Sequence, residues 1–210
     1  NCGALHPEHL AKKVVSTSSS LGIALDGDAD RLILVDDRGE VLDGDDILAV
    51  LAAHYKSKET LINNKIVTTI MSNKGLDLYM KQLGCQTHQT QVGDLHVMNA
   101  MKKHDCILGG ETSGHIIFKN LSTTGDGTLA ALKILEVVLS AQKPLSELRK
   151  NLKKFPQITE SFDVQKKIPL EDLPTVKTLI DNTQKQLGSE GRILFRYSGT
   201  EPKLRIMVEA

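Results

Sequence analysis

Three aspartates alternate with small residues in the segment 26–31, which reads Asp-Gly-Asp-Ala-Asp-Arg. In an extended chain, the carboxylates of Asp26, Asp28 and Asp30 point to one side. Left alone, they would repel one another and raise one another's pKa, and a bound divalent cation removes that conflict. Because all three side chains offer oxygen, the segment predicts a site for Mg²⁺, Mn²⁺ or Ca²⁺ rather than zinc.

An acidic surface turn is the simplest alternative for this segment. The apolar runs Gly22–Leu25 and Leu32–Val35 on either side predict buried strands, which would place the aspartates at the end of a sheet, where open α/β proteins bind ligands. An EF-hand fits less well, because Arg31 stands where that loop requires glycine. A guanidinium beside carboxylates instead suits a substrate that carries phosphate.

A second polar loop spans residues 109–115, Gly-Gly-Glu-Thr-Ser-Gly-His, after a short apolar run. The glycines allow a ligand to approach the backbone closely. Glu111, Ser113 and His115 offer an acceptor, a hydroxyl and an imidazole, a set that suits the hydroxyls of a sugar. A plain turn would explain the glycines but not the three polar groups.

A third loop, Arg-Tyr-Ser-Gly-Thr-Glu-Pro at 196–202, joins the last two predicted strands. A hydroxyl–glycine–hydroxyl turn presents backbone N–H groups to an anion, and arginines on both sides supply positive charge. The alternative is a tight hairpin with exposed arginines. The candidate phosphate ligands are Arg196, Ser198, Gly199, Thr200 and Arg205.

Strands and helices alternate between these loops, which predicts βαβ units and an α/β fold with a mixed, mainly parallel sheet. Asp43–Asp46 should begin a helix, because acidic residues cap free N–H groups there. The helix at 127–139 is apolar almost all round, so we expect it to be well buried. The other predicted strands are 65–70, 86–90 and 105–108, and the other helices 75–83 and 95–103.

After Phe155 and Pro156 the pattern changes to that of a smaller α+β domain. We predict a helix at about 175–187, ended by glycine, and alternating strands at 192–196 and 203–209. The two strands would carry the third loop between them.

The composition excludes several classes of protein. The 210 residues carry 26 basic and 26 acidic side chains, so nothing favours binding to nucleic acid or an anionic membrane. No apolar run is long enough to span a membrane, and no signal peptide is present. The three cysteines form no CxxC pair, which favours reduced thiols in the cytoplasm.

The three loops in this order, DGDADR, GETSGH and RYSGTEP, resemble the α-D-phosphohexomutase superfamily. Within it, the chain is most similar to the bacterial phosphoglucosamine mutases, on stretches such as Val92-Gly93-Asp94, Thr123–Gly127 and Phe155-Pro156-Gln157. The resemblance implies an isomerase of amino-sugar and peptidoglycan-precursor metabolism. It would interconvert glucosamine 6-phosphate and glucosamine 1-phosphate through a phosphoserine and a bisphosphorylated sugar.

The resemblance also implies roles for residues and parts of the chain. Asp26, Asp28 and Asp30 would hold Mg²⁺, Arg31 would steady the transferring phosphoryl group, and His115 would lie near as a proton-transfer group. Glu111 and Ser113 would hold sugar hydroxyls. Residues 1–42 would be the end of domain 2, 43–154 domain 3 and 155–210 a truncated domain 4.

Two departures from the family's pattern are apparent. No stretch matches the phosphoserine loop, so we expect the N-terminal domains of the same polypeptide to be partners and this chain alone to be inactive, with a weakly occupied metal loop. Leu95-His96 stands where phosphoglucosamine mutases usually carry arginine and tyrosine. Phosphomannomutase or phosphoglucomutase activity and an inactive substrate-binding fragment stay open as alternatives, as does a homodimer.

Overall fold

The computed structural model describes residues 3–188, 191–199 and 201–210. The chain forms two compact units, which divide between Lys153 and Lys154. The finer division of the first unit at residue 42 stays a prediction.

The first unit begins with a small antiparallel sheet that carries the acidic loop. Its strands lie in the order β1-β2-β3, and Leu25 pairs with Leu32 across the loop between β1 and β2. All five residues of β2 are buried, as the apolar run predicts. The helix α1 packs against β1 and β2. The bounds are α1 Glu8–Thr17, β1 Leu21–Leu25, β2 Leu32–Asp36 and β3 Val41–Leu42.

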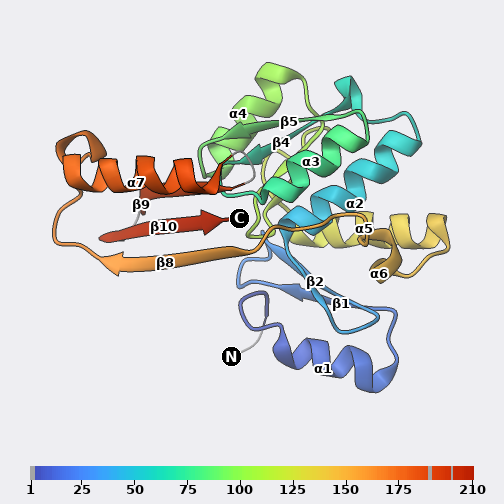
Figure 1. The fold of residues 1–210 in the computed structure, drawn as a ribbon. Helices are drawn as coiled ribbons and strands as arrows, with labels where there is room; N and C mark the ends of the chain where they lie inside the picture. The colour runs from blue at the N-terminus through green and yellow to red at the C-terminus, as the bar shows by residue number, and fades with distance from the viewer. Residues whose placement is uncertain (1–2, 189–190, 200) are drawn as a thin grey trace. The chain divides into compact units, whose positions relative to one another are not determined.

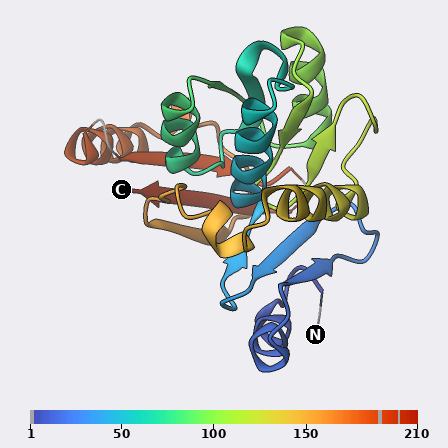
Figure 2. The same ribbon diagram turned by 90° about the vertical axis from the view of Figure 1, so that its right-hand side faces the viewer.

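A four-stranded sheet forms the centre of the first unit, in the order β5-β4-β6-β7 (Figure 1, Figure 2). The strand β4 runs parallel to both β5 and β6, and β7 returns antiparallel to β6. The predicted α/β class with a mixed, mainly parallel sheet is therefore confirmed. The bounds are β4 Lys65–Thr69, β5 Gln86–Thr90, β6 Leu108–Gly110 and β7 Ile116–Phe118.

Helices cover both faces of this sheet. Side chains alternate along β4, so Ile66 joins the core beneath α2 and α3, whereas Val67 joins a second core beneath α4. The helix α5 packs against α2. The helices are α2 Gly44–Ser57, α3 Lys74–Gln82, α4 Asp94–His104, α5 Gly127–Ala141 and α6 Leu145–Leu148, with a 3₁₀ turn η1 at Ile62–Asn64.

The start of α2 follows the prediction from its acidic residues. The Asp43 side chain accepts hydrogen bonds from the N–H groups of Asp45 and Asp46, at 2.9 and 3.3 Å. The Asp46 carboxylate accepts in turn from the Asp43 N–H, which completes a capping box. This cap fixes the point where the chain leaves β3 and enters the helix.

The expectation for α5 was wrong in part. Ala130, Ala131, Ile134 and Val137 are buried, but Leu132 and Leu139 lie 59% and 75% exposed. The helix α2 and the strands β1, β2 and β7 cover only one side of α5. The apolar residues on its other side therefore remain at the surface.

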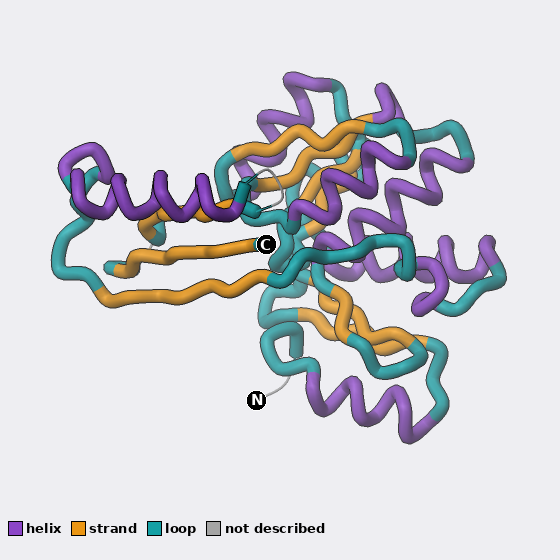
Figure 3. The backbone as a smooth tube through the Cα atoms, viewed as in Figure 1, coloured by secondary structure: helices purple, strands orange, loops and turns teal. Residues whose placement is uncertain are grey.

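The second unit is the predicted small α+β domain (Figure 3). Three antiparallel strands lie in the order β8-β10-β9, and α7 packs against β9. Arg192 donates to the fully buried Glu209 at 2.8 Å. This hydrogen bond joins the first residue of β9 to the last residue of β10. The elements are β8 Gln157–Asp163, η2 Leu170–Asp172, α7 Pro174–Leu187, β9 Arg192–Tyr197 and β10 Lys203–Glu209.

Candidate metal and ligand site

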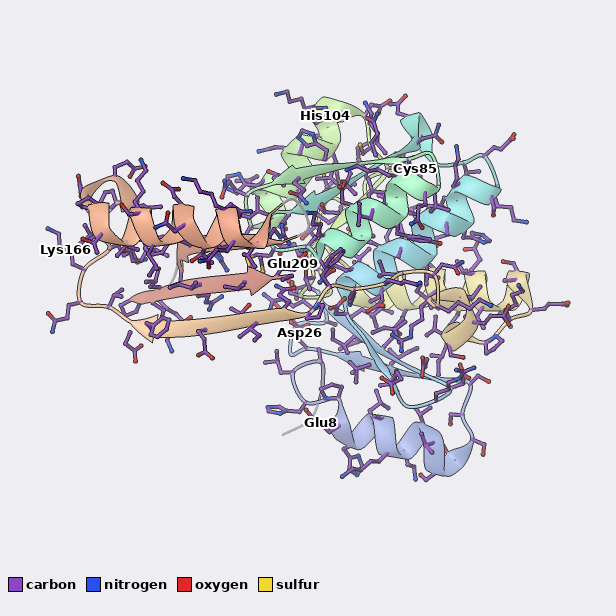
Figure 4. The ribbon with its side chains drawn as sticks, viewed as in Figure 1. Glu8, Asp26, Cys85, His104, Lys166 and Glu209 are labelled. Carbon is purple, nitrogen blue, oxygen red and sulfur yellow. The ribbon has the colours of Figure 1, made fainter. Side chains whose placement is uncertain are left out.

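The acidic loop is a tight turn and not the extended segment that the sequence predicted. The Ala29 N–H donates to the Asp26 carbonyl at 3.3 Å, and Ala29 has a φ of 59°, in the left-handed region. The Arg31 N–H donates to Asp26 Oδ1 at 3.1 Å. The carboxylates therefore converge because the backbone folds back, and not because they alternate along a strand. Asp26 follows β1 directly (Figure 4).

The three aspartates nevertheless meet as predicted. One carboxylate oxygen from each of Asp26, Asp28 and Asp30 lies within 4.8 Å of the other two. Asp30 Oδ1 is buried, and it accepts no hydrogen bond from the part of the chain that the structure describes. A buried anionic oxygen without a donor is costly unless a cation meets it. The donor set therefore fits an oxygen-preferring divalent ion.

The surroundings of Asp30 perturb its pKa. Its pKa is raised above the ordinary value, first by burial, then by a hydrogen bond with the Asp26 side chain, and less by the charges of Asp26 and Asp28. A positive charge on His115, present only when the ring is doubly protonated, would act in the opposite direction. A raised pKa means that the free loop resists full ionisation, which a bound cation would reverse.

His115 joins the 109–115 loop to the acidic loop. Its side chain is 6% exposed, and its Nδ1 lies 3.1 Å from Asp30 Oδ2. Its Nε2 accepts a hydrogen bond from the Gly125 N–H at 3.0 Å. Both ring nitrogens are therefore engaged, and proton transfer to a ligand would require one of these bonds to open.

Arg31 lies over the same carboxylates. Its Nε is 3.7 Å from Asp26 Oδ2 and 3.8 Å from Asp30 Oδ1, and its side chain is 45% exposed. Exposed pairs at such distances contribute little to stability. The guanidinium is therefore free to turn toward an anionic group without a large loss of stability.

The loop with Glu111 and Ser113 is fixed against the start of β2. The Leu32 N–H donates to the Gly114 carbonyl at 3.0 Å, and a Cβ on Gly114 would overlap the Leu32 carbonyl. Glu111 Oε1 accepts from the Gly93 N–H at 2.8 Å, whereas Ser113 is exposed. The structure thus brings the first two predicted loops together within one unit.

The third loop lies in the second unit. Arg196 and Arg205 face each other as direct partners of β9 and β10, and Arg205 also pairs with Glu201 at 3.0 Å. Like charges placed opposite each other across two strands repel, and an anion between them would relieve this. Ser198 is 5% exposed, and Gly199 would meet nothing with an added Cβ. Thr200 lies outside the described residues.

Three residues that the sequence did not assign to a site contact these loops. Gly125 and Asp94 lie at His115 Nε2, Asp94 with an Oδ2–Nε2 distance of 3.5 Å. In the second unit, Lys167 Nζ donates to the Ser198 carbonyl at 2.6 Å. The stretch Thr123–Gly127 contained the signal for Gly125, because two glycines flank an aspartate there. Nothing in the sequence distinguishes Lys167 from other surface lysines.

Comparison with known proteins agrees with this fold. Residues 43–155 match the sequence model "Phosphoglucomutase/phosphomannomutase, alpha/beta/alpha domain III", and residues 142–210 match that of the C-terminal domain of the same family. The chain belongs to the phosphoglucomutase/phosphomannomutase family. The resemblance to phosphohexomutases is thereby confirmed.

The curated relatives name a more specific enzyme than the family model does. The chain is 49% identical to phosphoglucosamine mutase of Desulfovibrio desulfuricans over 209 residues, which are 100% of this chain and 46% of that protein. It is 46% identical to phosphoglucosamine mutase of Chlamydia pneumoniae over 209 residues, which are 100% of this chain and 46% of that protein. The chain therefore spans about half the length of these curated relatives.

Solved structures share the fold. An N-acetylglucosamine-phosphate mutase of the α-D-phosphohexomutase superfamily, in its substrate complex, aligns with a TM-score of 0.78 at 22% identity, over 100% of this chain and 49% of that one. The Aspergillus fumigatus N-acetylphosphoglucosamine mutase in complex with GlcNAc-6P and magnesium aligns with a TM-score of 0.77 at 22% identity, over 100% of this chain and 53% of that one. Among the described residues, no helix has the length and apolar character to cross a membrane.

Proposed function

We propose that this chain carries the metal, sugar and phosphate sites of a phosphosugar mutase that interconverts glucosamine 6-phosphate and glucosamine 1-phosphate. The convergence of Asp26, Asp28 and Asp30 beside a loop that presents Glu111 and His115 is the observation that carries the proposal. The curated relatives named phosphoglucosamine mutase support the choice of sugar.

The three aspartates would hold Mg²⁺. The buried, unbonded Asp30 Oδ1 supports this assignment, as does the all-oxygen donor set. When bound, the ion would neutralise charge on a transferring phosphoryl group. The magnesium in the Aspergillus fumigatus complex agrees with this choice of ion.

The remaining residues would bind and orient the substrate. Arg31 is exposed enough to turn from the carboxylates and steady the transferring phosphoryl group. Glu111 and Ser113 would hold sugar hydroxyls, and His115 would act in proton transfer after one of its two bonds opens. Phosphoryl transfer depends mainly on such positioning and charge stabilisation.

The phosphate that does not react would bind in the second unit. Its ligands would be the guanidinium pair of β9 and β10 and the turn between these strands. A grip on the phosphate that does not react would let the enzyme accept either orientation of the sugar. The proposed ligands are Arg196, Ser198, Gly199, Thr200 and Arg205.

The chain alone should bind phosphosugar without turning it over, because none of its stretches matches a phosphoserine loop. Incubation of the 210-residue chain with glucosamine 6-phosphate, Mg²⁺ and a glucosamine 1,6-bisphosphate primer should give no glucosamine 1-phosphate. Measurable turnover would refute this part of the proposal.

The metal assignment is tested by Asp28→Asn, because Asp28 is the exposed residue of the three. Titration with Mn²⁺, followed by electron paramagnetic resonance, should show weak binding by the wild-type chain and a loss of at least about tenfold in the variant. Equal binding by both proteins would show that the aspartates are not the ligands.

Phosphomannomutase or phosphoglucomutase activity is the alternative, because the family model names both sugars. Calorimetric titration of the chain with glucosamine, glucose and mannose 6-phosphates would separate them. We expect the tightest binding for glucosamine 6-phosphate, and a preference for either of the other two would overturn the proposed sugar.

A further inference from the structure

A short segment after the 109–115 loop contacts both functional parts of the first unit. Thr124–Gly127 leads into α5, whose first residue is Gly127, and contains none of the residues assigned above to metal, sugar or phosphate. We propose that this segment is a positioning element that fixes the acidic loop and His115 together, with the imidazole proton held on Nδ1. The effect of this segment on catalysis rests on the proposed function, whereas its contacts with the acidic loop and His115 do not.

The last residue of the segment holds the acidic loop. The Gly127 N–H donates to the Ala29 carbonyl at 2.9 Å, at the one point in the loop where the backbone is left-handed. A Cβ on Gly127 would lie 2.8 Å from the Arg31 carbonyl and 2.9 Å from that of Ala29. Only glycine lets α5 begin this close to the loop, so Gly127 sets how the turn folds back.

The Gly125 N–H determines which ring nitrogen of neutral His115 carries the proton. A backbone N–H can only donate, so Nε2, which lies 3.0 Å from the Gly125 nitrogen, must be the unprotonated acceptor. The proton of the neutral ring then lies on Nδ1, from which it is donated to Asp30 Oδ2 at 3.1 Å. This bond leaves Asp30 Oδ1 for the cation, which is the arrangement by which outer groups orient metal ligands.

The two remaining residues anchor the segment itself. The Thr124 hydroxyl donates to Asp94 Oδ2 at 2.9 Å, and Asp126 caps α5 by accepting from the Leu129 N–H at 2.8 Å. The Thr124 bond also engages the carboxylate oxygen that lies 3.5 Å from the unprotonated Nε2. The segment is thus tied at both ends, and displacing it should move the acidic loop and the imidazole together.

The first test needs only the metal-free wild-type chain. Long-range ¹H–¹⁵N spectra of the histidine rings at about pH 8, above the ordinary imidazole pKa, report which nitrogen carries the proton. The chain has seven histidines, and sequential assignment of the wild-type spectrum through residues 114–116 identifies this ring. We expect protonated Nδ1 and bare Nε2. A ring protonated on Nε2 would overturn the inference without any variant having to fold.

Variants then test the segment. A methyl group at Gly125 would overlap the His115 ring, so Gly125→Ala should change the tautomer or mix the two forms. Thr124→Val should shift the His115 ring signals and the amide signals of residues 29–31, and Thr124→Ser should restore them. Gly84→Ala is the control for an added methyl group on a strained backbone away from both loops, because an added Cβ there meets nothing and Gly84, unlike Gly125 and Gly127, has a positive φ. Spectra of Gly125→Ala and Thr124→Val that match this control would overturn the inference.

A separate measurement distinguishes this inference from the proposed function. Gly127→Ala should weaken Mn²⁺ binding by about 10- to 100-fold, as loss of an outer-shell partner does, whereas Gly84→Ala should bind as the wild type does. Unchanged binding by Gly127→Ala would overturn the role of Gly127 as a positioning residue. A wild-type chain that binds no Mn²⁺ would overturn the metal assignment, and the ring tautomer would still decide the inference.

Discussion

Arg149 clamps the end of β2 that lies away from the acidic loop, and its removal should destabilise the first unit strongly. Its Nε donates to Asp36 Oδ2 at 3.0 Å, and its Nη1 lies 3.7 Å from Asp46 Oδ1. The side chains of Asp36 and Asp46 are 1% and 4% exposed. Arg149→Leu would therefore leave two carboxylates buried without their shared cation.

The expected loss follows from the surroundings of Asp36. Removing one partner of a buried ion pair costs about 3–5 kcal/mol. Asp36 keeps two donors, the N–H groups of Arg38 and Glu40 at 2.9 and 3.0 Å, and Arg149 itself is 26% exposed. We therefore expect the free energy of unfolding to fall by about 2–3 kcal/mol. For a unit of this size that lowers Tm by roughly 5–10 °C.

Urea and thermal unfolding followed by circular dichroism would measure this loss. Lys150→Met is the matched control, because Lys150 is the next residue and forms an exposed pair with Glu147 at 3.6 Å. The control should change the free energy of unfolding by less than about 0.5 kcal/mol. If Arg149→Leu lowers stability no more than Lys150→Met does, the clamp contributes nothing and the reasoning fails.

Three further predictions concern single residues of the first unit. Asp43→Ala removes the cap of α2 and should cost about 1–2 kcal/mol in urea unfolding, and an unchanged midpoint would contradict the role of the cap. Ala29→Gly relieves the left-handed backbone and should stabilise the metal-free chain by about 0.5–1 kcal/mol, so destabilisation would argue against strain there. The pKa of His88 is lowered by burial and then by His104, so the folded state binds fewer protons and loses stability as pH falls below about 6.5. This loss should be smaller in His88→Gln, and parallel pH curves for the two proteins would refute it.

The sequence predicted the longer apolar strands of the first unit, but it misplaced the glycine strand β6 and missed the three-residue strand β7, although β7 is apolar and buried. The run at 32–35 became β2, because each of its side chains contributes to a core. The strand expected at 105–108 lies instead at Leu108–Gly110. Asp105 ends α4 in a left-handed conformation, and two glycines carry no side-chain pattern to mark a strand. The exact position of a glycine strand is set by its neighbours in the sheet.

The sequence identified the candidate ligands but not what holds them. From the alternation of aspartates in residues 26–31 we predicted that their carboxylates converge, and they do. The predicted reason was wrong, because the loop is a turn around Ala29 and not an extended segment. The bond between Asp30 and His115 joins residues 85 positions apart, and no local pattern reports such a pair. Tertiary contacts decide both the turn and the orientation of the ring, which lies beyond the reach of local residue types.

The acidic loop owes its shape to residues that are not among the proposed metal ligands. At the near end of β2, the Leu32 N–H binds the Gly114 carbonyl, and at the far end Arg149 holds Asp36. Gly127 fixes the turn itself from the start of α5. Because β2 is only five residues long and buried throughout, a shift at either end must move the whole strand and the loop with it. An aspartate motif of this kind therefore forms a metal site only where such distant contacts hold its backbone in the folded-back turn.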